Sequence, residues 1–212
     1  MSASQPPVRA ARRRIPRPLI GVAVVLALAV VAGGLLVPRL VPERYVPWNT
    51  VAFPEVDRSA LTPLQGRVLD ELEQQYRDPQ SGPFYSEGVT QAWCANFVSW
   101  IMSRAGAPYV NPNSGHWRIP GVWTLHDYFV GEQRFVPADT GYVPRTGDVV
   151  LYISPFGSEH TNMVVSADPQ TGTAITLGGN ETGAVRLHRL RWEDDGAVIG
   201  FGQLPEGPAI AG

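Results

Sequence analysis

The pattern of apolar and polar positions predicts two amphipathic helices in the first half of the folded part of the chain. The first begins at 62–65, where Thr62 can cap the helix, Pro63 suits the first turn and Gln65 can complete a capping box. The second follows Thr90-Gln91 and ends at Gly106. Their apolar stripes are Leu61, Leu64, Val68, Leu72 and Tyr76 in the first helix, and Cys94, Phe97, Val98, Ile101 and Ala105 in the second.

The second half of the chain changes to a different pattern. Residues 107–121 are rich in Pro, Asn and Gly and predict a loop, and a short amphipathic segment with Trp123, Leu125, Tyr128 and Phe129 follows. From Gly147 the apolar period is two, which predicts strands at 149–153, 163–165, 174–177, 185–187 and 198–201. The connections, such as the turn-rich 168–172, are too short for helical crossovers, so we expect an antiparallel sheet and an α+β fold.

An uncharged apolar run at 19–37 predicts one transmembrane helix. A 19-residue helix spans roughly 28 Å, which is close to the thickness of a bilayer core. Residues 1–18 carry five arginines and no acid, so we expect a cytoplasmic N-terminus and an extracytoplasmic remainder on a single-pass signal anchor of the cell membrane. A cleaved signal peptide with its cleavage site at 30–32 is the alternative; the apolar run continues beyond that site, which favours the anchor.

Composition divides the rest of the chain and excludes some partners. The Pro-rich stretch 38–56 is expected to be a linker, 57–204 a single domain and 205–212 a flexible tail. From residue 38 onward there are 12 arginines against 19 acids, a net charge of −7, which argues against nucleic acid as a partner. The basic N-terminus fits membrane topology and anionic lipid headgroups instead.

Cys94 is the only cysteine of the chain and a candidate nucleophile. A free thiol has a pKa near 8.5, and a helix N-terminus or a cationic histidine can lower such a value to roughly 3.5–7.5. The alternative is that Cys94 is simply a small buried apolar residue. One cysteine cannot form an intramolecular disulfide, and it leaves no thiolate pair for a metal, so neither a metal nor another cofactor is expected.

A thiol nucleophile requires a base and a group that orients the base. His160 opens an apolar strand, which would hold its imidazole on a rigid element, and it is the expected base. Asn180 ends the next strand, where antiparallel pairing would bring it beside His160, and adjacent Glu181 could substitute for it. The other histidines, His116, His126 and His188, are expected to be structural or superficial, with His188 on a solvated strand face.

Four motifs in the same order resemble the CHAP family of papain-like cysteine amidases and peptidases. They are WCANFVSW at 93–100, GDVV at 147–150, His160 before an apolar strand, and Gly179-Asn180. The resemblance implies a papain-like fold, and hydrolysis of peptidoglycan either between muramic acid and L-alanine or within the wall peptides. By the same resemblance Cys94 is the nucleophile, His160 the base and Asn180 the orienting group. Many family members carry an acid two positions before the asparagine, where this chain has Gly178, so an acidic contribution is expected from Glu181.

Further candidates surround the nucleophile. Backbone N–H groups near Cys94, and the side chain of Gln91, are candidate donors to an oxyanion. Trp93 is a candidate for substrate binding together with Trp117, Trp123 and Tyr152, although packing in the core is the competing role for these aromatic residues.

Two other functions fit the same pattern. One is a catalytically silent, membrane-tethered CHAP-like domain that binds or scaffolds other proteins of the cell envelope. The other is a hydrolase or transferase of the same fold acting on a non-wall amide or a lipid thioester. The sequence contains Cys94, His160 and Asn180 together, which favours a hydrolase.

Overall fold

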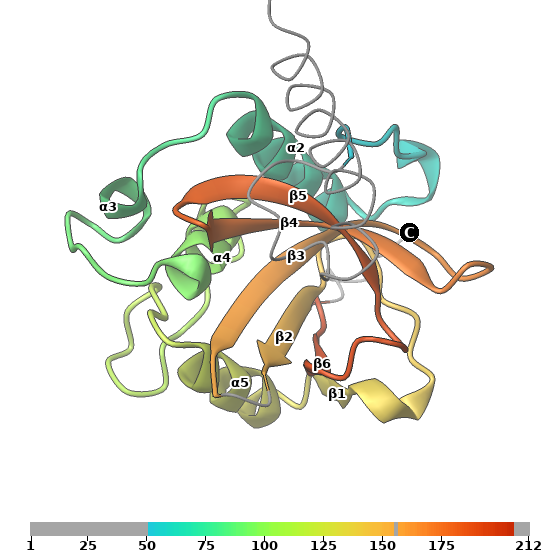
Figure 1. Cartoon of the computed structure of the whole chain (residues 1–212). Coiled ribbons are helices and arrows are strands. Elements are labelled where there is room, and N and C mark those ends of the chain that lie inside the picture. The colour runs from blue at the N-terminus through green and yellow to red at the C-terminus, as the bar shows by residue number, and fades with distance from the viewer. Residues whose placement is uncertain (1–50, 155–156, 206–212) are drawn as a thin grey trace, which may run out of the picture. The chain divides into compact units, whose positions relative to one another are not determined.

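The structure is a computed structural model that describes residues 51–154 and 157–205. Helices come first and strands later along this part of the chain, so the predicted α+β class is confirmed (Figure 1). Within the described residues, no helix is long and apolar enough to cross a membrane. The predicted span at 19–37 and the tail from residue 206 lie outside the described residues.

The helical elements are η2 (Arg58–Ala60), α2 (Pro63–Arg77), α3 (Gly82–Tyr85), α4 (Cys94–Arg104), α5 (Val122–Gly131) and η3 (Ala138–Thr140). The predicted capping box of α2 is confirmed, because Thr62 Oγ1 accepts from the Gln65 N–H while Gln65 Oε1 accepts from the Thr62 N–H. Helix α4 begins at Cys94, later than the sequence pattern indicated, and α3 lies in a stretch where no helix was expected.

The strands are β1 (Phe135–Pro137), β2 (Val149–Ile153), β3 (Glu159–Asp168), β4 (Thr173–Glu181), β5 (Ala184–Arg191) and β6 (Val198–Gly202). They form one antiparallel sheet in the order β1-β6-β2-β3-β4-β5, with the predicted hairpin joining β3 to β4. The short edge strand β1 was not predicted from the sequence, because three residues are too few to display a period of two.

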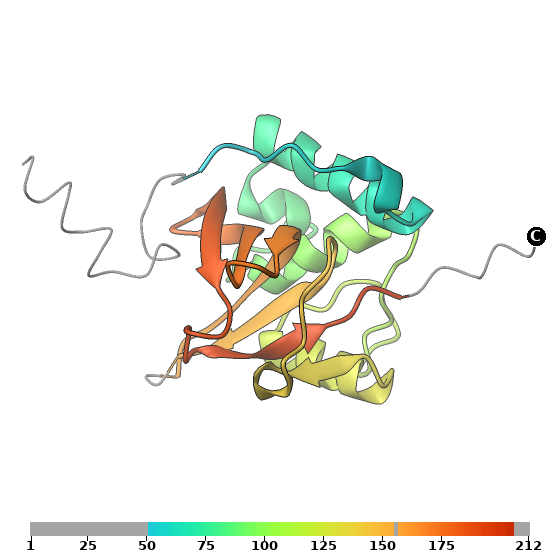
Figure 2. The ribbon, with the colours of Figure 1, turned by 90° about the vertical axis from the view of Figure 1, so that its right-hand side faces the viewer.

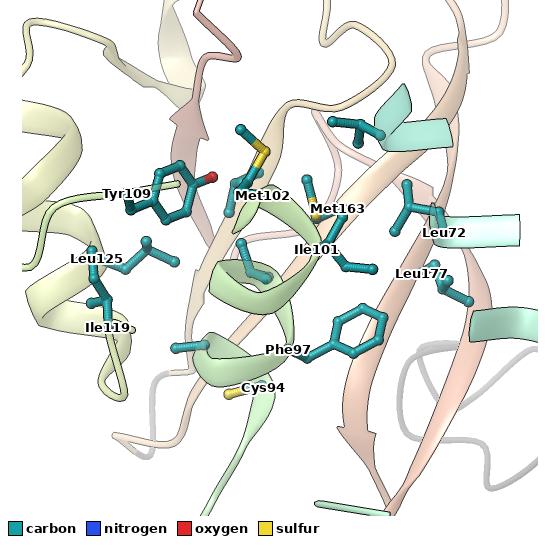
Figure 3. Packing of buried hydrophobic residues seen from close by; sticks show 14 of the residues in the cluster. Leu72, Cys94, Phe97, Ile101, Met102, Tyr109, Ile119, Leu125, Met163 and Leu177 are labelled. Carbon is teal, nitrogen blue, oxygen red and sulfur yellow. The ribbon is translucent and has the colours of Figure 1, made fainter. Parts of the chain in front are cut away.

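Both faces of the sheet are buried. Helix α4 packs on β3 and β4, and α2 covers α4 from outside, as Figure 2 shows. The core on this helix side includes Phe97, Ile101, Met163 and Leu177 (Figure 3). Leu151 belongs to the same cluster. A second cluster lies on the other face and consists of Val150, Tyr152, Val164, Ala174, Leu190, Trp192, Val198 and Phe201. The alternation along β2, with Leu151 in one cluster and Val150 in the other, follows from the pleat of a strand.

Candidate active site

Cys94 is the first residue of α4 and is 6% exposed (Figure 3). The first turn of this helix closes with the Phe97 N–H donating to the Trp93 carbonyl at 2.9 Å, and Trp93 provides no side-chain cap. The N–H groups of Cys94, Ala95 and Asn96 therefore have no acceptor within the helix, as is general for the first turn. The thiol thus lies at the positive end of the helix dipole.

Trp93 fixes the chain at the entrance to α4. Its indole is buried and stacks on Tyr85 with ring centroids 5.2 Å apart and planes at 12°. A Cβ atom on either Gly82 or Gly179 would lie 2.5 Å from the indole, so both positions must lack a side chain. Trp93 is therefore a core residue next to Cys94, rather than part of an open aromatic groove.

His160 lies near the start of β3, opposite Tyr152 of β2, with the two rings 6.1 Å apart. Its Nε2 atom is 2.8 Å from Oε1 of Glu181, and the Cys94 thiol is close enough to the ring to raise the pKa of His160. Because Nε2 faces Glu181, Nδ1 is the nitrogen that serves the thiol. The structure therefore joins a sulfur, an imidazole and a carboxylate from α4, β3 and β4.

The electrostatics of this group favour a His160 imidazolium beside the Glu181 carboxylate. Burial lowers the pKa of His160, but hydrogen bonds with Cys94 and Glu181, together with their negative charges, outweigh burial and raise that pKa well above its ordinary value. Burial raises the pKa of Glu181, but the hydrogen bond with His160 and the nearby His160 and His188 rings lower it overall. Glu181 is therefore a carboxylate at neutral pH, although only 5% of it is exposed.

The carboxylate of Glu181 has a second donor on β3. Asn162, which is fully buried, donates from Nδ2 to Oε1 of Glu181 at 2.9 Å. A Cβ atom on Gly178 would overlap the Asn162 amide and would lie 3.1 Å from Glu181 Oε1. This chain therefore has no room for an acid at position 178, and the carboxylate comes from Glu181, as expected.

Asn180 occupies a different position from the one expected for an orienting group. The register of β3 and β4 pairs Met163 with Leu177, and its regular continuation would place Asn180 opposite His160. However, Asn180 has a φ of 62°, and the pairing of β4 with β5 shifts by one residue between Gly178 and Glu181. Such a bulge turns the next side chain to the other face of the sheet, which brings Glu181 to His160. Among the hydrogen bonds of the described residues, none joins Asn180 to His160.

A pocket opens beside the imidazole. Its lining residues are Tyr152, Ser154, Ser158, Glu159, His160, Asn180, Glu181, Thr182 and Ala197. Asn180 therefore borders the same space as the His160 ring. Gln91 is exposed in the bend just before α4, and its candidate role as an oxyanion donor stays a prediction.

The remaining histidines have different environments. His116 is half-exposed, and its Nε2 atom lies 3.8 Å from Glu87 Oε1. His126 lies on α5 beside Asp127. The expectation that His188 lies on a solvated face is wrong: it is 1% exposed, and its Nε2 atom lies 3.5 Å from Glu181 Oε2.

Sequence reasoning also missed Asn162 as a site residue. The available signal was a polar residue two positions after His160, on the same face of an otherwise apolar strand.

For metals, the residues that the structure describes contain no group of three or more His, Cys, Asp or Glu side chains able to hold an ion.

The comparison with protein families agrees with this arrangement. Residues 85–180 match the family model of the CHAP domain. The matched segment runs from the end of α3 through the Cys94 helix and the His160 strand to Asn180, and the resemblance drawn from the sequence is confirmed. CHAP domains are generally associated with hydrolase activity on peptidoglycan. No curated protein matches the chain.

Proposed function

We propose that this CHAP domain is a cysteine amidase or endopeptidase that hydrolyses amide bonds of bacterial peptidoglycan. Cys94 is the nucleophile, His160 the general acid and base, and Glu181 the group that orients the imidazole. The observation that carries the proposal is the position of His160, whose Nε2 atom lies 2.8 Å from the Glu181 carboxylate and whose pKa is raised by the nearby Cys94 thiol.

The proposed reaction has two acyl-transfer steps. The Cys94 sulfur attacks the carbonyl carbon, and the C–N bond breaks as the His160 imidazolium transfers its Nδ1 proton to the leaving amine. Water then attacks the thioester while His160 takes its proton, which releases the acid and restores the thiol and imidazole pair.

The start of α4 supplies the stabilisation that the tetrahedral intermediate needs. Its first N–H groups, including that of Cys94 itself, have no acceptor within the helix and point out of its N-terminal end. Removing one donor of this kind in a protease costs about 3–4 kcal/mol of barrier. Gln91, exposed just before the helix, is the proposed side-chain contributor.

Glu181, in place of Asn180, is proposed as the third member of the catalytic triad, after Cys94 and His160. A carboxylate hydrogen-bonded to one imidazole nitrogen fixes the ring orientation and stabilises the imidazolium. Asn180 borders the pocket and is proposed to contact substrate instead.

The proposed location is the outer side of the cell membrane, where the substrate lies. It rests on the sequence alone: the basic residues before 19–37 and the absence of charge within that run. Protease accessibility in intact spheroplasts tests it, since the domain should be digested from outside.

The direct test of the activity is digestion of purified peptidoglycan by the full chain, with new termini identified by mass spectrometry. Wild type should release fragments, and Cys94→Ser should not, while Ser103→Ala, a control on the same helix, should match wild type. A new L-alanine amino terminus identifies an amidase, and a new terminus within the wall peptides identifies an endopeptidase. Binding without release by wild type would contradict the proposal and support the silent scaffold.

A further inference from the structure

His188 is a buried imidazole that the proposed reaction does not use. It lies on β5 opposite Thr176 of β4 and is 1% exposed. Within the described residues, neither of its ring nitrogens makes a hydrogen bond. An apolar side chain would fill such a position at lower cost, because a buried polar group without a hydrogen bond loses its contacts with water.

The charged group closest to this imidazole is part of the proposed active site. His188 Nε2 lies 3.5 Å from Oε2 of Glu181, while His160 Nε2 lies 2.8 Å from Oε1 of the same carboxylate. Glu181 is therefore placed between two histidines, one on each oxygen. The carboxylate is 5% exposed, and electrostatic contacts are strong in such a buried setting because water screens them little.

We propose that His188 is a positioning residue that holds the Oε2 edge of Glu181 and thereby fixes the carboxylate in the orientation that His160 requires. The inference rests on the proposed function, since His160 matters as the partner of a catalytic thiol. In this arrangement His188 presents Nε2–H to the carboxylate and touches neither substrate nor sulfur.

The other charged groups near His188 do not replace this contact. Arg186, two residues earlier on β5, donates from Nε to the Glu181 backbone carbonyl at 3.1 Å, and so binds the main chain of that residue. His160 on β3 lies across the carboxylate on the other oxygen. Helix α2 packs against the opposite face of β5, where Leu187 joins the helix-side core. His188 is therefore the group placed to act on Oε2.

Loss of this contact has a defined consequence for the thiol. Contact with His188 favours the charged form of Glu181, so without it Glu181 takes up a proton at higher pH. A neutral Glu181 no longer supports the His160 imidazolium, and the Cys94 thiolate loses its counter-charge. The acid limb of the pH profile of Cys94 alkylation is the range in which the rate falls as the pH is lowered. This limb should therefore move to higher pH.

The test is the rate of iodoacetamide alkylation of the full chain as a function of pH, which reports Cys94 alone because the chain has one cysteine. For His188→Leu we expect the acid limb to move up by about one pH unit, which makes alkylation on that limb about tenfold slower. His188→Gln keeps an N–H donor and should stay within about twofold of wild type. The matched control is His116→Leu at a half-exposed position, which should leave the profile unchanged.

The same profile for wild type and His188→Leu, with only the melting temperature lowered, would overturn the proposal. If His188→Leu does not fold, nitrogen NMR of the wild-type histidine rings decides the question. We expect a proton on Nε2 of His188; an Nδ1–H tautomer with a bare Nε2 against the carboxylate would refute the role. Alkylation does not depend on wall cleavage, so a wild type that leaves peptidoglycan intact but shows the His188-dependent profile overturns the proposed function alone.

Discussion

Oε1 of Glu181 lies 2.8 Å from Nε2 of His160, at the place that a regular continuation of β3 and β4 would give to Asn180. The left-handed backbone of Asn180 and the one-residue shift in the pairing of β4 with β5 produce this exchange. The polar group beside the base is therefore charged, and a charged partner stabilises an imidazolium more than a neutral amide does.

Glu181→Gln should lower kcat/KM for wall hydrolysis on the order of 10²–10⁴-fold, because the imidazolium loses its charged partner. The matched variant is Asn180→Gly, since glycine adopts the left-handed backbone of this position without strain. We expect it to raise KM by a few-fold at most and to leave kcat near wild type. Steady-state kinetics on soluble wall fragments measure both. The reverse ranking of the two variants would show that Asn180 orients the base.

Gly178→Ala should destabilise the domain by about 1–3 kcal/mol, because the added methyl group overlaps the Asn162 amide and overpacks the site. Activity should fall as well, since Asn162 is one of the donors to Glu181. Gly66→Ala on α2 is the control: nothing lies within 4 Å of its Cβ position, and alanine favours a helix by about 0.5–1 kcal/mol. Denaturant unfolding of the two variants should shift in opposite directions, and equal shifts would disprove the packing argument.

The stability of the domain should depend on pH through His160 and Glu181. The folded-state pKa of His160 is raised, so its contribution is complete below about pH 6.5 and is lost as pH rises through the folded-state value. The folded-state pKa of Glu181 is lowered, so its contribution is present above about pH 4.3 and is lost as pH falls. The difference in unfolding free energy between wild type and His160→Gln should therefore be largest between these limits. A difference that stays constant up to alkaline pH would contradict the ion pair.

Trp93→Ala should lower the free energy of unfolding by about 3–5 kcal/mol, the usual cost of deleting a buried large aromatic side chain. The stacked contact with Tyr85 and the close approach of Gly82 and Gly179 are the reasons. Trp123→Ala is the exposed comparison, since Trp123 is 48% exposed, and its effect should stay within about 0.5 kcal/mol. Thermal and denaturant unfolding measure both. A stable Trp93→Ala variant with a raised KM would instead favour a role in substrate binding.

Much of the fold could be predicted because its signals are local. The capping box at Thr62 and the apolar stripe of the Cys94 helix depend on residues three or four positions apart, and the strands display a period of two. The same local patterns selected Cys94 and His160 as candidates, and the structure places Cys94 at the start of α4 and His160 near the start of β3.

The third member of the site depends on structure that no local pattern encodes. Regular alternation favoured Asn180, and a single bulge changed which side chain faces His160. The burial of His188 was missed for a related reason. A strand that alternates polar and apolar residues is expected to have one solvent-exposed face, but here the second core cluster lies on that face of the sheet.

The proposed mechanism requires a covalent bond between Cys94 and the substrate, and trapping that bond tests the mechanism most directly. The full chain is mixed with wall fragments, quenched in acid within one turnover, and analysed by intact and peptide mass spectrometry. We predict that the chain gains the mass of the acyl half of the substrate, located on the Cys94 peptide, and that Glu181→Gln accumulates less of it. Cleavage that proceeds without an adduct and survives Cys94→Ala would contradict the account.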